Sequence, residues 1–520
     1  MFSTVLSGAV CGIRGQLVHV EVDASHGLPC FAMVGDLGNE VKEAGERVRV
    51  ALKNAGFALP PMHITINLSP ADIRKEGTAF DLPIALCILA AMEVIKKETL
   101  QDTFVVGELG LNGEIKPVRG ILSLAACAVR EGCRKMLVPK GNGKEAAVFD
   151  GLEVREAGSL QQVLEMLRFG NRETVRIDVN ELFRPSKLED KLDFGDIKGQ
   201  ETLKRAAVIA AAGFHHLLLL GPPGAGKTMI AKRMPALLPP LTLEESLEVS
   251  TIYSVAGRRQ ADTLMTRRPF VDPHHTISPS ALVGGGKGPQ PGAVTLAHRG
   301  VLFLDELPEF KRSMIDSLRQ PLENREVHIA RTYGSFIYPA QFMLVAAMNP
   351  CPCGYYPDTS RCSCTAYEIH RYLSHISGPI LDRMDLCVEA PRVEIGKLNE
   401  SEWKRNGEHQ QEAEGTNRQM QAQVERARDR QKIRYGNVGK TNGELAGDEV
   451  MRYCALESRE LAFMEQIYLT MQLSARGYHR ILKVARTIAD LADCEQIREE
   501  HLAEAVCYRV SEYKEFANGK

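Results

Sequence analysis

The sequence predicts an α/β protein built around a parallel β-sheet with helices on both of its faces. Residues 217–220 are four leucines, a short apolar run of the kind that a buried parallel strand forms. A glycine-rich turn and a segment with helical character follow at once, and two further apolar runs, 301–304 and 344–348, occur downstream. Apolar strands that alternate with helical patterns are typical of βαβ units, so we expect these runs to pair in one sheet.

The composition is that of a globular chain with several domains. A length of 520 residues predicts roughly two to four domains of ordinary size. Hydrophobic residues make up 44% of the chain and charged residues 25%, which allows sizeable cores. The net charge of −2 excludes a general polycation, so any contact with nucleic acid must be local.

Nothing in the sequence predicts export or a membrane span. Residues 1–24 lack the charged and apolar regions of a secretory signal, and the apolar stretch 82–92 is too short to cross a bilayer. The simplest expectation is a cytoplasmic protein with reduced thiols. In that compartment clustered cysteines suggest a metal before a disulfide, and the chain has 13 cysteines.

Five segments are expected along the chain. The first, 1–170, alternates short strands with helices; we expect strands at 18–22, 63–68 and 135–139 and helices at 41–54, 81–92 and 121–131. A polar, proline-containing linker at 171–192 leads to the domain with the parallel sheet, 193–395. The highly charged segment 396–449 predicts an exposed helix or flexible connector, and 450–520 predicts a group of amphipathic helices.

The segment after the leucine strand has the spacing of a phosphate-binding loop. The pattern G-x-x-x-x-G-K-[ST] is matched in full by Gly221, Pro222, Pro223, Gly224, Ala225, Gly226, Lys227 and Thr228. Glycines let the backbone wrap a polyphosphate with its amides inward, and the following helix contributes its positive end. Lys227 would neutralise the outer phosphates, and the Thr228 hydroxyl would ligate Mg²⁺. The alternative is a glycine-rich turn without a ligand.

The two later strands end in polar residues that suit the same chemistry. The run 301–304 is followed by Asp305, which can hold Mg²⁺ through water, and by Glu306, which can polarise the attacking water. The run 344–348 is followed by Asn349, whose amide can hold that water near the terminal phosphate. Alone, these patterns could be a strand that ends in solvated acids and an Asn-Pro turn. Together with the phosphate loop they predict an Mg²⁺-dependent ATPase.

Several short segments resemble one group of AAA+ ATPases. The phosphate loop, the LFLDE sequence at 302–306, the strand-end Asn349 and the later Leu381-Asp382-Arg383-Met384-Asp385 occur in the order found in that superfamily. The amino-acid sequences of further segments resemble those of the magnesium-chelatase-related ATPases: 193–200, 210–213, 273–275, 319–323, 377–379 and 485–491. With the first 170 residues included, the chain resembles the ComM/YifB family along nearly its whole length.

This resemblance implies an AAA+ core with a C-terminal helical lid, and it gives roles to two arginines. Arg383 would be an arginine finger that reaches the nucleotide of a neighbouring subunit. Arg476 would be the second sensor arginine, on the lid and facing its own nucleotide. A finger that acts in trans needs an oligomer, and the family implies a homo-hexameric ring. The alternative for each arginine is a surface salt bridge.

Two insertions in this domain carry cationic side chains. Lys287 lies in a glycine loop at 280–292, and Arg331 lies in a hairpin expected at 326–340. In AAA+ rings such elements line the central pore, where these side chains would meet phosphates of branched or single-stranded DNA. Solvated loops without a ligand are the alternative.

The first domain resembles the peptidase domain of the Lon proteases, which has a ribosomal-S5-like α+β fold. The resemblance rests on residues 70–81 and 107–115. The position of the nucleophilic serine of that family falls at Ala79, and the position of its lysine falls near Leu122. Neither side chain can do the chemistry, so we expect a binding or ring-assembly module without peptidase activity.

A cysteine cluster follows Asn349. It consists of Cys351, Cys353, Cys362 and Cys364, which bracket an eight-residue loop. Four thiolates so close can bind Zn²⁺ tetrahedrally, although the C-x-C spacing is tighter than the usual C-x₂-C. The alternative is buried or incidental cysteine. A zinc ion would brace the segment between Asn349 and Arg383.

The resemblance implies a ring motor that acts on DNA and drives branch migration of recombination intermediates during transformation, powered by ATP and Mg²⁺. The main alternative is a magnesium-chelatase-like ATPase that remodels a protein partner, although the chelatase motor subunit lacks the first domain. An ATP-dependent protease is opposed by Ala79 and Leu122. A scaffold without motor activity is opposed by the intact residues Lys227, Asp305, Glu306 and Arg383.

Overall fold

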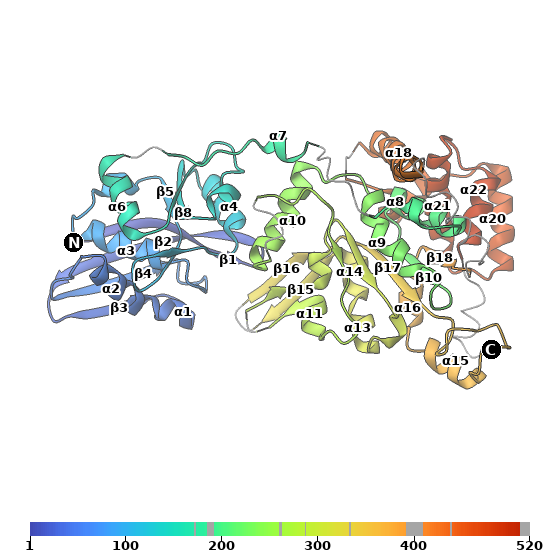
Figure 1. Ribbon diagram of the computed structural model, residues 1–520, viewed down its shortest axis with the longest axis horizontal. Helices are drawn as coiled ribbons and strands as arrows, with labels where there is room; N and C mark the ends of the chain where they lie inside the picture. The colour runs from blue at the N-terminus through green and yellow to red at the C-terminus, as the bar shows by residue number, and fades with distance from the viewer. Residues whose placement is uncertain are drawn as a thin grey trace.

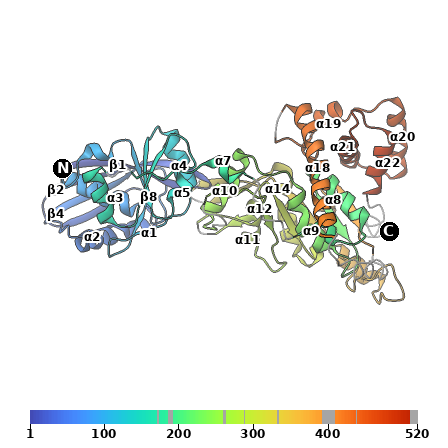
Figure 2. The same cartoon turned by 45° about the horizontal axis from the view of Figure 1, so that its top comes forward.

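In the computed structural model the chain forms three regions that follow one another along the long axis (Figure 1). The structure describes residues 1–170, 173–184, 192–258, 263–286, 288–331, 334–391, 409–436 and 439–509. An N-terminal α/β region lies at one end, a second α/β region lies in the middle, and the C-terminal helices lie at the other end, beside the middle region in both views (Figures 1 and 2). Among the described residues, no helix is both long enough and apolar enough to cross a membrane.

A mixed sheet of seven strands forms the N-terminal region. In their hydrogen-bonded order the strands are β3 (Cys30–Val34), β4 (Met62–Ser69), β2 (Arg14–His26), β1 (Phe2–Cys11), β5 (Thr103–Val105), β8 (Lys135–Pro139) and β9 (Glu153–Ala157). The pairs β1–β2 and β2–β4 are antiparallel, and the other pairs are parallel. The strands predicted at 18–22, 63–68 and 135–139 are confirmed as parts of β2, β4 and β8.

Helices bury their apolar sides on this sheet. Every residue of α3 (Asp81–Ala91) is buried, and α3 shares a hydrophobic cluster with α2 (Ala44–Asn54). The helix α4 (Ile121–Arg130) belongs to a second cluster. The helices predicted at 81–92 and 121–131 are therefore confirmed. The helix predicted at 41–54 is interrupted at Glu43, which separates α1 (Asn39–Lys42) from α2.

The middle region contains the predicted parallel sheet. Its five strands are ordered β11 (Phe270–Val271), β14 (Val301–Leu304), β17 (Met343–Met348), β10 (Leu217–Leu220) and β18 (Leu386–Glu389), and every pair is parallel. The three apolar runs of the sequence are thus confirmed as strands of one sheet. Because the strands are parallel, the segments that follow β10, β14 and β17 all leave the sheet at the same edge.

Both faces of this sheet are covered, which explains why its strands are apolar without alternation. Leu217 and Leu219 belong to one hydrophobic cluster, together with α8 (Glu201–Gly213), α9 (Lys227–Leu237) and the C-terminal helices. Leu218 and Leu220 belong to another cluster, which includes α13 (Arg312–Ser317) and α16 (Gly378–Leu381).

The C-terminal region is helical, as predicted. It contains α18 (His409–Tyr435), α19 (Asp448–Tyr453), α20 (Ser458–Thr470), α21 (Ala475–Leu491) and α22 (Glu499–Cys507). The helix α18 lies within 396–449, where the charge-rich sequence predicts an exposed helix or flexible connector. Met420, Val424, Ala427 and Gln431 are buried, and their spacing of three and four residues puts them on one side of α18, which packs on α8 and α21. This part of the segment therefore belongs to the helical region.

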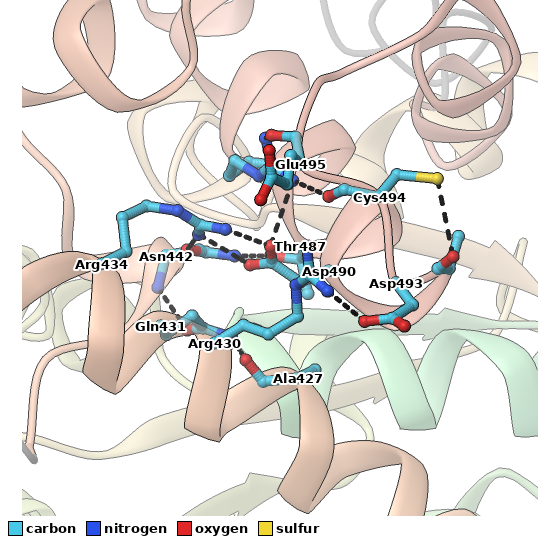
Figure 3. A network of polar contacts seen from close by, with 12 residues as sticks. Ala427, Arg430, Gln431, Arg434, Asn442, Thr487, Asp490, Asp493, Cys494 and Glu495 are labelled. Carbon is cyan, nitrogen blue, oxygen red and sulfur yellow. Dashed lines mark hydrogen bonds and ion pairs between the residues drawn. The ribbon is translucent and has the colours of Figure 1, made fainter.

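A buried carboxylate ties three segments of the helical region together (Figure 3). The side chain of Asp490, on α21, has no exposed surface. It accepts hydrogen bonds from Arg434 of α18 (2.9 Å), from Asn442 of the connecting loop (2.9 Å) and from Arg486 on α21 (3.1 Å). A buried charge is tolerated only when it is paired and hydrogen-bonded in this way.

The N-terminal region contacts the middle region through α4. This helix packs on α10 (Leu243–Val255), and the amide of Gly120 donates a hydrogen bond to the carbonyl of Ser254 (3.1 Å). Leu122 is fully buried in a small apolar cluster with Val148 and with Leu264 of the middle region. The predicted linker takes part in this cluster, because residues 179–183 pack against it.

We expect Asp490→Asn to lower the free energy of unfolding of the C-terminal helices by about 3 kcal/mol, because two guanidinium groups lose their counter-charge in a buried place. Hydrogen exchange of the α21 amides, followed by mass spectrometry, would report this loss as faster exchange.

The matched control is Asp493→Asn. Asp493 pairs with Arg430 near the protein surface, and its side chain is 87% exposed (Figure 3). Exposed pairs contribute little to stability, so this variant should exchange as the unmodified protein does. Equal exchange in the two variants would contradict the role given to Asp490.

Candidate functional site

The phosphate-binding pattern forms a loop between the strand β10 and the helix α9. Gly224 and Gly226 have φ angles of +77° and +86°, in the left-handed region that glycine adopts without strain. This backbone turns the chain so that α9 begins at Lys227. The free amides and the positive end of α9 therefore face the space above the loop, as an anion site requires.

Lys227 lies at the centre of this loop and is largely buried. Its ammonium group donates hydrogen bonds to the carbonyls of Gly221 (2.6 Å) and Pro222 (3.0 Å) and to Oδ1 of Asn349 (3.1 Å). Asn349 directly follows β17, the neighbour of β10. Burial lowers the pKa of Lys227 below its usual value, although Asp305 and Glu306 oppose the shift. The structure thus brings Lys227 and Asn349 together, as the sequence predicts.

Thr228 and Asp305 form the second contact of the site. The Thr228 hydroxyl donates a hydrogen bond to Oδ2 of Asp305 at 2.8 Å, and Asp305 directly follows β14. Residues from three different strand ends therefore converge on one place. A hydroxyl beside a carboxylate offers the hard oxygen ligands that Mg²⁺ prefers, and Mg²⁺ usually keeps waters in its remaining positions.

Glu306 is held in an unusual backbone conformation at the rim of the site. Its φ angle is +51°, which is uncommon for a residue with a side chain and points to a conformation imposed by its surroundings. Its amide donates to Oδ1 of Asp305 (3.0 Å), and its carboxylate lies 3.8 Å from Nδ1 of His275. The Glu306 side chain is 58% exposed, so water reaches it.

His275 belongs to this site, but the sequence analysis gave it no role. It noted only that residues 273–275 resemble a segment of the magnesium-chelatase-related ATPases. The residue follows β11, and its ring packs against that of His274 with centroids 4.1 Å apart. Asp272 lies nearby, and burial, with the charge of Asp305 as a smaller contribution, raises its pKa. The sequence shows a pair of histidines just after a short apolar strand. This pattern alone does not indicate that His275 lies close to Glu306.

Arg383 and Arg476 meet at a shared carboxylate. The Arg383 guanidinium pairs with Oε1 of Glu323 and donates to the carbonyl of Pro379 (2.5 Å). The Arg476 guanidinium lies 3.8 Å from the same Glu323 oxygen. The sequence analysis did not assign Glu323 a role, because only the fold brings Glu323 of α14 (Arg319–Asn324) close to Arg476 of α21.

These arginines line a cavity of about 390 Å³ at the other edge of the sheet. The cavity is lined by His216, Phe342 and Asp385, which stand at the amino ends of β10, β17 and β18, and by none of residues 221–228. The resemblance implied that Arg476 faces the nucleotide of its own subunit. The structure instead places it with Arg383, at the edge opposite the phosphate loop.

Positive charge dominates this arginine cavity. Five cationic side chains and three carboxylates line it: Arg325, Arg383, Arg476, Arg480 and Lys483, with Glu323, Asp385 and Glu444. Asp385 accepts a hydrogen bond from the amide of His216 (3.1 Å) and lies 3.7 Å from the Arg480 guanidinium. Burial opposes the ionisation of Asp385, but His215 and Lys483 outweigh it and hold its pKa well below the usual range. The Asp385 carboxylate is therefore an anion among the cationic side chains that line the cavity.

The two inserted elements predicted to meet DNA lie side by side. The predicted hairpin is confirmed as β15 (Glu326–Arg331) and β16 (Gly334–Pro339). Its exposed Arg331 donates a hydrogen bond to the carbonyl of Gly286 in the glycine loop (3.3 Å). Lys287, the other predicted DNA contact, lies outside the described residues. Glu76 of the N-terminal region lies beside Gly288 of the same loop.

The four clustered thiols converge, as their spacing predicts. Their sulfur atoms, on Cys351, Cys353, Cys362 and Cys364, all lie within 4.8 Å of one another. The Cys351 thiol is buried, and the other three are partly buried.

Two substitutions separate binding from hydrolysis at the phosphate loop. Lys227→Ala should abolish tight ATP binding, because the phosphates lose their cation. Glu306→Gln should bind ATP normally but hydrolyse it about 10²–10⁴-fold more slowly, because the amide cannot accept a proton from water. Equilibrium binding of a fluorescent ATP analogue and release of phosphate measure the two effects.

The matched control is Glu309→Gln. Glu309 is an exposed carboxylate three residues further along the chain, and a protein with this substitution should hydrolyse ATP at the normal rate. Normal turnover by Glu306→Gln would show that another group prepares the water.

Comparisons with known proteins agree with this geometry. The family model described as "Magnesium chelatase, subunit ChlI" matches residues 193–398, the region with the phosphate loop. The model "Subunit ChlI of Mg-chelatase" matches residues 20–142, and "Magnesium chelatase, subunit ChlI C-terminal" matches residues 414–509. The last match begins within α18, in agreement with its packing into the helical region.

Relatives match the chain from end to end. The chain is 42% identical to competence protein ComM of Haemophilus influenzae over 97% of both chains. It is also 42% identical to the protein YifB of Escherichia coli, over 98% of this chain and 97% of that one. The magnesium-chelatase 38 kDa subunit of Rhodobacter capsulatus is 29% identical over 32% of this chain and 52% of its own. The protein therefore belongs to the ComM/YifB family of magnesium-chelatase-related AAA+ ATPases.

Proposed function

We propose that this protein binds ATP with Mg²⁺ at the carboxyl edge of the middle sheet and hydrolyses it. The observation that carries the proposal is the convergence of Lys227, Thr228, Asp305 and Asn349 from three strand ends, within hydrogen-bonding distance of one another in pairs. This set of groups meets at the glycine-rich loop. It matches the parts that phosphoryl transfer to water requires.

Each side chain has a task in that reaction. Thr228 and Asp305 would hold Mg²⁺, which neutralises charge on the phosphates when bound. Lys227 would exchange its backbone carbonyl partners for phosphate oxygens. Glu306 would accept a proton from the attacking water, and Asn349 would orient that water. The exposed position of Glu306 and the amide of Asn349 beside Lys227 support these two roles.

We propose further that the arginine cavity receives the nucleotide of a neighbouring subunit in a homo-hexameric ring. Arg383 and Arg476 lie at the edge of the sheet opposite their own phosphate loop, so both arginines would act in trans. The excess of cations over carboxylates in the cavity suits the phosphates of a neighbour. Glu323 would release the two arginines to the stronger anion.

The work coupled to hydrolysis is proposed to be movement of DNA in the cytoplasm, in the form of branch migration during transformation. Support comes from the end-to-end similarity to a protein named for competence and from Arg331 beside the glycine loop. The alternative is a remodeller of a protein partner, as the similarity to a magnesium-chelatase subunit would suggest. That similarity covers only 32% of this chain, whereas the similarity to ComM covers 97%.

The N-terminal region is proposed to be a Lon-like module without peptidase activity. Ala79 offers no nucleophile, and the buried Leu122 offers no base. Lys75 is fully buried, and its ammonium group donates to the carbonyl of Pro70, so this cation is engaged by the backbone. The packing of α4 on α10 supports a role as a docking module instead.

Mixing two inactive variants tests the trans arrangement. Arg383→Ala should bind ATP but lose hydrolysis by about 10³-fold or more, the usual contribution of an arginine finger. Mixed with Lys227→Ala, it should regain part of the activity, because some interfaces then combine an intact Arg383 with an intact phosphate loop. Phosphate release at several mixing ratios measures this. Full activity in a protein that sediments as a monomer would contradict the ring.

A salt titration tests the coupling to DNA. We expect DNA to stimulate hydrolysis, and the stimulation to fall steeply with added salt, because a chain of net charge −2 must bind through local basic loops. Replacing both Arg331 and Lys287 by alanine should remove the stimulation by a four-way junction and the strand movement measured on a gel.

The matched control is Arg459→Ala. Arg459 is 80% exposed on α20 of the helical region, so its loss should leave the stimulation intact. If junctions and forks leave the rate of the unmodified protein unchanged at low salt, without strand movement, the remodeller becomes the leading function.

A further inference from the structure

The loop that follows β17 has little regular structure to hold it in place. Between β17 and α15 (Ala366–Leu373), residues 349–365 form no helix and no strand. Ordered loops of this length in compact domains need another source of order. Of the loop's side chains, only those of Pro350 and Cys351 are apolar and buried, and both lie near its start.

The four cysteine sulfurs of this loop have the spacing of ligands around one ion. The Sγ atom of Cys351 lies 3.3 Å from that of Cys353 and 3.8 Å from that of Cys362, and the latter two lie 3.6 Å apart. A tetrahedral zinc ion with Zn–S bonds of about 2.3 Å places its sulfurs about 3.8 Å apart. A disulfide bond of about 2.05 Å is far shorter than any of these separations.

The backbone around the thiols supports the same arrangement. The amide of Tyr356 donates to Sγ of Cys351 at 3.4 Å, a contact that stabilises a thiolate. The amide of Gly354 donates to the carbonyl of Cys351 (3.0 Å), and that of Cys362 donates to the carbonyl of Asp358 (2.8 Å). These turns bring the two C-x-C pairs face to face, which compensates for the short spacing within each pair.

We propose that Cys351, Cys353, Cys362 and Cys364 bind one Zn²⁺ ion in a closed structural site, and that this site holds the loop against the phosphate loop. Four thiolates and no open position suit a structural ion rather than a catalytic one. The first part of the proposal concerns the metal alone. The second part rests on the proposed ATPase function.

The contact with the phosphate loop is made by Gly354, between the two cysteine pairs. Gly354 has a φ angle of +82°, and a Cβ atom built there would lie 2.5 Å from Cδ of Pro223 and 3.7 Å from Cγ of Asn349. The backbone of the cysteine loop therefore packs directly on the phosphate loop and beside the amide that contacts Lys227. An ion that holds Gly354 in place would therefore also hold the phosphate loop and the side-chain amide of Asn349 in place.

Metal analysis of the full-length protein tests the site without reference to activity. Elemental analysis of protein purified without chelators should find about one zinc per chain. Cys353→Ser and Cys362→Ser should lower the zinc content about tenfold or more. Cys507→Ser, at an exposed thiol on α22, should not change it.

Cobalt substitution covers the case in which a cysteine variant fails to fold. The unmodified protein, refolded or exchanged with Co²⁺, should show the thiolate-to-cobalt charge-transfer absorption and the intense visible bands of a tetrahedral S₄ site. Protein that contains iron in place of zinc, or metal-free protein in which these cysteines form disulfides, would overturn the zinc site.

A glycine variant separates the metal from its effect on hydrolysis. Gly354→Ala should keep the zinc but lower the rate of ATP hydrolysis by about tenfold or more, because the new methyl group collides with Pro223 and shifts groups that must be placed to within a fraction of an ångström. Gly132→Ala is the matched control, since Gly132 has a similar φ angle of +76° with open space around it.

The outcomes distinguish the two parts of the proposal. A normal hydrolysis rate in zinc-bound Gly354→Ala would overturn the link to the phosphate loop while leaving the zinc site in place. A zinc-loaded unmodified protein without any ATPase activity would instead contradict the proposed function.

Discussion

The parallel pairing of the middle sheet is the constraint on which the rest of the molecule depends. Because all five strands run in one direction, every segment that leaves a carboxyl end leaves at the same edge, and every segment that enters does so at the other. The first edge gathers Lys227, Asp305 and Asn349, and the second gathers the arginines. In the proposed ring, one subunit would thus offer a nucleotide site at one edge and, at the opposite edge, its arginines to the nucleotide of a neighbour.

The helical region is attached to this sheet through buried polar contacts as well as apolar packing. His215, just before β10, bonds to Thr487 of α21 (2.8 Å), and the next residue donates its amide to Asp385. Asp385 stands two residues after Arg383 and close to Arg480 of α21. The start of β10, the segment with the proposed finger and the helix with Arg476 are therefore positioned by one connected set of groups. A movement of α21 would therefore also move the start of β10 and the segment that carries Arg383.

Patterns with a local cause were predictable from the sequence, and contacts between distant segments were not. The phosphate loop and the strands before Asp305 and Asn349 follow from glycine spacing and apolar runs, and the structure confirms that they meet. The side of the sheet on which Arg476 lies depends on how α21 docks, and no single-residue pattern encodes that. The packing of α18 could not be predicted, because the four buried positions among its described side chains are spread among charged residues. Glu323 and His275 acquire partners only in three dimensions.

The burial of Leu122 at the joint between the N-terminal and middle regions limits which side chains this position can hold. A lysine at this position would have to place an ammonium group among Val148 and Leu264, where water cannot reach it and no carboxylate is at hand in the described cluster. Placing a serine at Ala79 and a lysine at Leu122 would therefore not give the proposed Lon-like module a working dyad, because the space that a base needs is filled by contacts between the two regions. The side chain that position 122 can hold is therefore set by the packing between the two regions.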